Sequence, residues 1–185
     1  MPQSAQLMDS STLKLQLGSL DFNVEALRLP EGPAIDRLVL SSGALDVAMA
    51  DGRTQASGAI ELEAEISALS IQEFLSRQDL GGLEQVEVEI VPPRMILRGK
   101  KKVALLPVGV EVHCGLEIRD QSQIWVVLLE VKGIAGIARG AIESALERSN
   151  PVFDGTKIPL PVALTFREVT LMERTVRLRG AVSIK

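Results

Sequence analysis

The stretch 133–150, GIAGIARGAIESALERSN, decides our prediction of the fold, because it is the long helical pattern in a chain whose other segments have the character of strands. At 3.6 residues per turn, its apolar side chains fall within about half of the helix circumference. Arg139 and Glu143 lie on the opposite side, four residues apart, where they can form a surface ion pair. Asn150-Pro151 ends the pattern, because the residue before a proline disfavours the helical conformation. We therefore predict an amphipathic helix over residues 134–149.

The side chains at the centre of the apolar arc of this predicted helix are small, because alanines lie there between isoleucines. Two interpretations remain open. The small residues either allow close packing of the helix on a sheet, or they leave room for a ligand chain. In the second case, the helix residues that line the site are Ile134, Ile137, Ala138, Ala141, Ile142 and Ala145.

Composition favours one ordinary globular domain spanning residues 1–185. Hydrophobic residues make up 46% and charged residues 24%, which suits a chain of 185 residues with a real core. Aromatic residues make up only 3%, so the core must be aliphatic. The net charge of −4 argues against a nucleic-acid-binding protein, which normally presents a basic face. A single cysteine, Cys114, excludes an internal disulfide.

The sequence also bears on location. No run approaches the roughly 18 apolar residues of a membrane-spanning helix. The first residues, MPQSAQLMDSSTLKLQL, lack the basic start and apolar centre of a signal peptide. We therefore expect a cytoplasmic protein or one peripheral to a membrane, and a periplasmic protein if a leader was removed. The oligomeric state stays open.

Most other segments alternate apolar and polar residues with the period of a strand. Residues 12–29 predict either one long bent strand or a hairpin. Residues 70–79 are the exception, because Ser70 and Glu73 have the spacing of a capping box that starts a short helix. Residues 122–132 are apolar nearly throughout and predict a strand that is covered on both faces or borders a cavity. From these two segments, the candidate lining residues are Phe74, Leu75, Trp125, Val127 and Leu129.

An internal repeat indicates a sheet built from similar hairpins. The segment VEIVPPRMILRG (88–99) and the segment VTLMERTVRLRG (169–180) carry apolar residues and a final glycine at the same spacing. The repeat is too irregular for a solenoid array.

The residues needed for catalysis are missing. A Ser-His-Asp triad requires a histidine base, and His113 is the sole histidine. It stands beside Cys114 in a predicted strand, so the two side chains point to opposite faces and cannot act together on a metal. We predict no metal, no cofactor and no enzymatic activity. A lipid hydrolase remains a weak alternative that would need a nucleophile without a histidine base.

Basic residues cluster in the two repeated hairpins. They could attract anionic lipid headgroups at about 1 kcal/mol each, or they could form a solvated outer face opposite glutamates. The candidates for headgroup or membrane-surface contact are Arg94, Arg98, Lys100, Lys101, Lys102, Arg177 and Arg179.

The order of these elements resembles the LmeA-like family of bacterial phospholipid-binding proteins. The resemblance is carried by AEISALSIQEFL (64–75), the two repeated segments, GIARGAIESALERSNPV (136–152) and IPLPVAL (158–164), and it covers roughly residues 35–184. It implies a tubular lipid-binding fold like that of bactericidal/permeability-increasing protein, in which a long, curved antiparallel sheet wraps a helix and lipid chains lie in the groove between them. Family members usually carry a secretion signal or membrane anchor, and this chain departs from that pattern.

We therefore expect an α+β fold with a long curved antiparallel sheet around the helix 134–149, plus the short helix 70–79. The expected function is non-enzymatic binding of phospholipid or another acyl-chain lipid in an apolar groove between helix and sheet, with possible peripheral membrane contact. The alternative is a structural or protein-interaction module whose core is fully packed.

Overall fold

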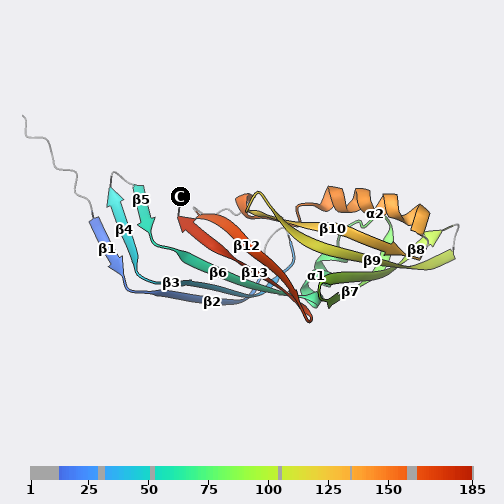
Figure 1. Cartoon of the computed structure of the whole chain (residues 1–185), viewed down its shortest axis with the longest axis horizontal. Helices are drawn as coiled ribbons and strands as arrows, with labels where there is room; N and C mark the ends of the chain where they lie inside the picture. Colours follow the sequence, from blue (N-terminus) through green and yellow to red (C-terminus); the bar gives the residue numbers. More distant parts are fainter. Residues whose placement is uncertain are drawn as a thin grey trace, which may run out of the picture.

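Antiparallel strands make up most of the described part of the chain. The computed structural model describes residues 13–28, 32–50, 53–103, 106–133, 135–157 and 162–184. Their strands form three antiparallel sheets, accompanied by two α-helices and a short 3-10 helix. The molecule is elongated (Figure 1). The predicted α+β class with antiparallel strands is confirmed.

Sheet I has five strands and joins the N-terminal part of the chain to the C-terminal part. Each neighbouring pair of strands is antiparallel. In spatial order, the strands are β12 (Val162–Met172), β13 (Thr175–Ile184), β6 (Ile60–Ser67), β3 (Ile35–Ser42) and β2 (Leu20–Leu27).

Sheet II also has five antiparallel strands, drawn mostly from the middle of the chain. A single turn of 3-10 helix, η1 (Gly155–Lys157), follows its shortest strand. In spatial order, the strands are β11 (Phe153–Asp154), β10 (Gln123–Lys132), β9 (Leu106–Arg119), β8 (Arg94–Val103) and β7 (Leu83–Val91).

Sheet III is small and continues three strands of sheet I beyond a common bend. Its order is β1 (Leu13–Leu17), β4 (Leu45–Ala50) and β5 (Arg53–Ser57). One glycine lies at each of the three bends, at Gly18, Gly43 and Gly58. A side chain at Gly58 would lie 2.6 Å from the side chain of Leu45, so only glycine fits there. Residues 12–29 therefore contain one bent strand from Leu13 onward, and not a hairpin.

Sheets I and II each have an apolar face and a charged face, because successive strand residues point to opposite sides. In β6, the apolar residues Ile60, Leu62, Ala64 and Ile66 are buried. The glutamates between them lie opposite arginines, in the pairs Arg167–Glu61 (3.0 Å), Arg177–Glu65 (3.1 Å) and Arg179–Glu63 (2.9 Å). The charged faces are thus outer surfaces, and the apolar faces of the two sheets form the core.

Helix α1 (Ala68–Leu75) corrects the predicted short helix at both ends. The N-cap is Ser67, whose hydroxyl accepts a hydrogen bond from the backbone N–H of Ser70 at 3.1 Å. The capping box at Ser70 was the wrong choice because β6 runs directly into the helix, so the last extended serine caps it. The Ser70 hydroxyl donates to Asp36 at 3.0 Å instead, which ties the helix to β3.

Helix α2 (Ala135–Ser149) agrees with the predicted range 134–149, of which Ile134 lies outside the described residues. The predicted surface pair is confirmed, since Arg139 Nε lies 3.1 Å from Glu143 Oε1. The helix packs mainly against β10. Three of its described side chains are buried: Ile142, Ala145 and Leu146.

Asn150 holds the end of α2 against the edge of sheet II. Its side-chain oxygen accepts a hydrogen bond from the backbone N–H of Val126, and its amide nitrogen donates to the Val126 carbonyl, both at 2.9 Å. Two residues later, the backbone N–H of Val152 donates to the carbonyl of Ile124 at 3.0 Å. Asn150 therefore replaces a strand residue beside β10 before β11 takes over the pairing.

The internal repeat corresponds to two hairpins with the same register. In the hairpin β7–β8, Ile90 pairs with Met95, and Val88 pairs with Leu97. In the hairpin β12–β13, the equivalent pairs are Leu171–Val176 and Val169–Leu178. The two hairpins belong to different sheets, so the repeat places one copy on each side of the core.

Candidate functional site

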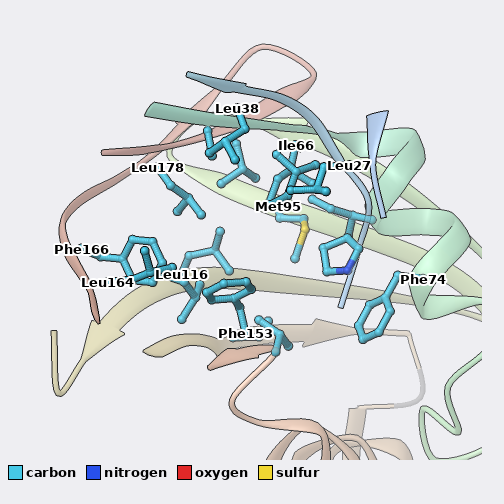
Figure 2. Close-up of a pocket in the computed structure, with 18 of the residues that line it drawn as sticks. Leu27, Leu38, Ile66, Phe74, Met95, Leu116, Phe153, Leu164, Phe166 and Leu178 are labelled. Atoms are coloured by element: carbon cyan, nitrogen blue, oxygen red, sulfur yellow. The ribbon is translucent and has the colours of Figure 1, made fainter. Parts of the chain in front are cut away.

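An apolar cavity of about 400 Å³ lies between the inner faces of sheets I and II. Figure 2 shows labelled side chains from both sheets pointing toward the same empty space, with Leu38 and Leu178 on one side and Leu116 and Phe153 on the other. Its volume falls within the roughly 300–1,000 Å³ typical of small-molecule sites.

Regular alternation along the strands of sheet I supplies much of the cavity wall. In β6, the lining residues Leu62, Ala64 and Ile66 are two positions apart, as the strand period requires. The other lining residues from sheet I are Leu27, Ile35, Leu38, Leu40, Val162, Leu164, Phe166, Val176, Leu178 and Val182.

Sheet II, α1 and the end of α2 complete the wall. Sheet II contributes Met95, Leu97, Leu116, Ile124, Val126 and Phe153. The remaining lining residues come from helices and connections: Pro33, Ile71, Phe74, Leu75, Leu80, Leu146, Ser149 and Val152. Helix α2 reaches the cavity only with Leu146 and Ser149 among its described side chains.

The described wall of the cavity is almost entirely apolar. Among the described lining residues, Ser149 is the one with a polar side chain. No charged side chain of the described wall faces the cavity, so an ionised group placed inside would be desolvated without a partner. The site therefore suits the hydrocarbon part of a ligand and excludes its charged part.

The β12 side of the cavity is closed by contacts between the two sheets. The rings of Phe153 and Phe166 pack edge to face, with centroids 5.5 Å apart and an interplanar angle of 72°. The backbone N–H of Phe166 also donates to the carbonyl of Gln121, in the β9–β10 turn, at 2.6 Å. These contacts fasten β12 to sheet II and give that side of the cavity a fixed wall.

The structure brings some predicted lining residues into the wall and places others elsewhere. Phe74 and Leu75 line the cavity as predicted. Ala141, Ile142 and Ala145 do not belong to the described wall, and the latter two pack in the core instead. Ile134 lies outside the described residues, and the side chains of Ile137 and Ala138 lie outside the described side chains.

The predicted lining residues of β10 lie on the wrong face of that strand. Ile124 and Val126 face the cavity, so their neighbours Trp125 and Val127 point to the outer face. The Trp125 ring packs there under the guanidinium of Arg119, whose central carbon lies 4.3 Å from the ring centroid. Leu129 falls at a register shift between Leu128 and Glu130 and is 54% exposed.

Most of the predicted headgroup residues form ion pairs with glutamates on the outer faces. Arg177 and Arg179 pair with glutamates of β6. Arg98 pairs with Glu89 and with Glu111, and these hydrogen bonds raise the pKa of the guanidinium.

Of the other predicted headgroup residues, Lys102 also has a glutamate partner, and the rest have different surroundings. Arg94 lies 3.0 Å from the His113 ring, and Lys101 donates to the backbone carbonyl of Gly81 at 2.7 Å. Lys100 and Lys102 are exposed, and Lys102 lies 3.3 Å from Glu84.

His113 is buried beneath charged side chains on the outer face of sheet II. Its Nδ1 atom faces two groups, Arg94 Nη1 at 3.0 Å and Glu130 Oε2 at 3.3 Å, and its Nε2–H donates to the Glu111 carboxylate at 2.7 Å. Together with the bond from Arg98, this bond holds the pKa of Glu111 at about 2. Cys114 points to the opposite face, where burial raises the pKa of its thiol to about 12.

The outer face of sheet II therefore carries a network of charged side chains around His113. Both ring nitrogens of His113 have partners, and the Cys114 thiol is buried in the core. In the part of the chain that the structure describes, no group of His, Cys, Asp or Glu side chains has a geometry suited to a metal ion.

Sequence reasoning missed the lining residues of sheet I and of the hairpin β7–β8. Their alternation was visible, but alternation alone does not tell which apolar face meets which other face. The internal repeat was the available signal, since its inward residues Met95, Leu97, Val176 and Leu178 all line the cavity.

Comparison with known proteins adds no relative, because no family profile, curated protein or solved structure matches this chain. The resemblance to the LmeA-like family therefore stays a prediction.

Proposed function

We propose that the protein binds the acyl chain of an amphiphilic lipid, such as a phospholipid, in the cavity between sheets I and II. The observation that carries this proposal is the apolar volume of about 400 Å³ with a single polar side chain in its described wall. A fully packed core, the alternative function as a structural module, would leave no space of this size, since native interiors rarely contain voids much larger than a water molecule.

The cavity volume sets the length of chain that fits. At about 30 Å³ for a group the size of water, the volume corresponds to about 13 such groups, close to one acyl chain. Burial at about 0.8 kcal/mol per methylene gives about 10 kcal/mol before the cost of association, which is at least about 4 kcal/mol. An affinity in the micromolar to millimolar range for a single chain follows from this difference.

The charged part of the lipid would remain outside, because the described wall offers it no partner. The predicted site lay between a curved sheet and an amphipathic helix. In this proposal the helix supplies only a small part of the wall. The C-terminal turn of α2 closes one part of the cavity with Leu146 and Ser149, while most of the wall belongs to the sheets. Binding involves no covalent step, so we propose a lipid-binding protein and not an enzyme.

Among the described residues, none of the helices combines the length and apolar character needed to cross a bilayer. The cavity favours an acyl chain, and the predicted resemblance to the LmeA-like family favours phospholipid among the amphiphiles that carry one.

Organic extraction of the purified protein followed by mass spectrometry tests the proposal. The expected result is a lipid at up to one molecule per chain, replaceable by a fluorescent fatty acid or phospholipid after delipidation. Absence of extracted lipid, together with no uptake of either probe, would contradict it. An acyl-chain series gives a sharper test: affinity should rise by about fourfold per methylene up to about 13 carbons and then level off.

A further inference from the structure

The apolar inner face of sheet I continues past the cavity onto the edge strand β2. Phe22 pairs with Leu40, and Leu20 pairs with Ser42. Residues directly opposite each other in an antiparallel pair project from the same face, with Cβ atoms about 5 Å apart. Since Leu40 lines the cavity, Phe22 and Leu20 lie on the inner face, immediately beside the cavity wall.

Exposure on this inner face rises from the middle of sheet I to its β2 edge. Along one row of paired residues, Leu62 is 6% exposed, Leu40 is half-buried, and Phe22 is 49% exposed. In the next row, Ile60 is 7% exposed and Leu20 is 36% exposed. Figure 1 shows β2 and β3 running on beyond sheet II toward sheet III. The cover that sheet II gives to β12 therefore does not reach β2 in these rows.

Leu20, Phe22 and Val24 form a continuous apolar row, which we call the β2 strip. The three side chains follow one another at the strand period and span about 13 Å of β2. Val24 is half-buried and pairs with Leu38, which also lines the cavity. Apolar side chains exposed singly are common on protein surfaces, whereas this row borders an apolar cavity along its length.

The size of the cavity indicates what covers the β2 strip. Its volume of about 400 Å³ is close to that of one acyl chain, and its described wall offers no partner to a charged group. In a lipid with two chains, the headgroup and the second chain must therefore lie outside the enclosed space. The β2 strip is apolar surface that adjoins the cavity, so a second chain that emerges there stays in contact with apolar side chains.

A second copy of the protein fits the β2 edge poorly. Antiparallel pairing of two β2 strands around Asn23 would set Asp21 of one copy opposite Glu25 of the other. Like charges directly opposite each other across two strands are destabilising. The charges of β2 thus disfavour a dimer formed through this edge.

Building on the proposed function, we propose that the ligand is a lipid with two acyl chains, of which one fills the cavity and the other lies on the β2 strip. Phe22 determines the preference for two chains over one, because its exposed ring is the largest apolar surface of the strip. The cavity binds the first chain whether or not a second one is present.

Two monomeric probes test this proposal, each used below its critical micelle concentration. One is a twelve-carbon lysophosphatidylcholine, and the other is the same lipid with an added six-carbon second chain. A fully enclosed methylene contributes a factor of about four to affinity. A chain on the β2 strip is covered on one side only, so we expect about twofold per carbon and about 60-fold tighter binding of the two-chain probe by calorimetry.

The variant Phe22→Thr removes the ring and keeps a residue with strand propensity. Covering half of a phenylalanine side chain of about 200 Å² corresponds to a factor of up to about 70. Phe22→Thr should therefore reduce the advantage of the second chain at least tenfold, while binding of the single-chain probe changes less than twofold. The matched control is Leu129→Thr on the outer face of sheet II, where Leu129 is 54% exposed. It should change the binding of neither probe more than twofold.

The two probes separate a failure of this proposal from a failure of the proposed function. If the single-chain probe binds and the second chain adds nothing, the β2 strip is not a chain site. Equal losses in Phe22→Thr and Leu129→Thr would overturn the proposal as well. So would a dimer in analytical ultracentrifugation that Phe22→Thr dissociates, since a second copy would then cover the strip. If neither probe binds, the proposed function itself is wrong.

Discussion

The substitution Ala64→Leu distinguishes an open cavity from a packed core. Ala64 lies in the middle of β6, lines the cavity and is 3% exposed. The substitution adds three carbons toward the space between the sheets. In an open cavity those carbons find room, and in a packed core they collide with their neighbours.

The expected magnitude follows from the volume. Three added groups at about 30 Å³ each take up about a quarter of the cavity. At about 0.8 kcal/mol per buried carbon, the delipidated protein should gain up to about 2 kcal/mol in the free energy of unfolding. The same carbons displace about three methylenes of a bound chain, so affinity for a chain of 13 or more carbons should fall about 50-fold.

Urea denaturation of the delipidated protein and titration with a fluorescent fatty acid measure the two effects. The matched control is Ala181→Leu on the adjacent strand β13, because Ala181 pairs with Glu61 on the outer face and does not line the cavity. This control measures the effect of the strand propensity of leucine. It should change neither the free energy of unfolding nor the free energy of fatty-acid binding by more than about 1 kcal/mol. A loss of 1–3 kcal/mol in Ala64→Leu would refute the open cavity, since overpacking costs that much. Unchanged affinity would show that the chain binds elsewhere.

Three further predictions concern other parts of the structure. Asn150→Ala should lower the free energy of unfolding by about 2–3 kcal/mol in urea, because it leaves both backbone groups of Val126 without their partners, and an unchanged value would contradict this pairing. The folded-state pKa of Glu111, about 2, lies below its ordinary value of 4.5, so its stabilising contribution is complete above pH 4.5 and is lost as the pH falls toward 2. The melting temperature should therefore fall more steeply from pH 6 to 2 for the wild type than for Glu111→Gln, and parallel curves would contradict the lowering of the Glu111 pKa by His113 and Arg98. Cys114 should react with a thiol reagent only at the rate of unfolding, because it is fully buried and its pKa is raised to about 12; a rate independent of added urea would show local access instead.

Several elements were predictable because their signals are local. Helix α2 (Ala135–Ser149) follows from a period of 3.6 and a terminating Asn-Pro, and its pair Arg139–Glu143 follows from their spacing alone. The two repeated hairpins were predictable for the same reason. Their apolar positions and turns lie within twelve residues, so the register of each hairpin is fixed by its own sequence.

The errors arose where two local signals competed. Ser67 and Ser70 could each cap the short helix, and the sequence favoured Ser70 because Glu73 follows it at the right spacing. In the structure, β6 runs to Ser67, and this residue caps the helix. In β10, residues 124–129 are all apolar, so alternation offered no means of choosing a face. The pairing with β9 made that choice and turned Ile124 and Val126 inward.

The sequence by itself determined which residues are apolar, their period in each segment, and hence most strands and the helical segment that forms α2. These properties depend on neighbours within a few residues. Only the tertiary structure decided that the inner faces of two different sheets meet, and that the space between them, more than the helix, forms the cavity. That decision depends on pairings between residues far apart in the chain, such as Leu178 with Ala64, and on the side-chain volumes that meet across the core. A cavity is the space that those volumes leave unfilled, and no single segment encodes it.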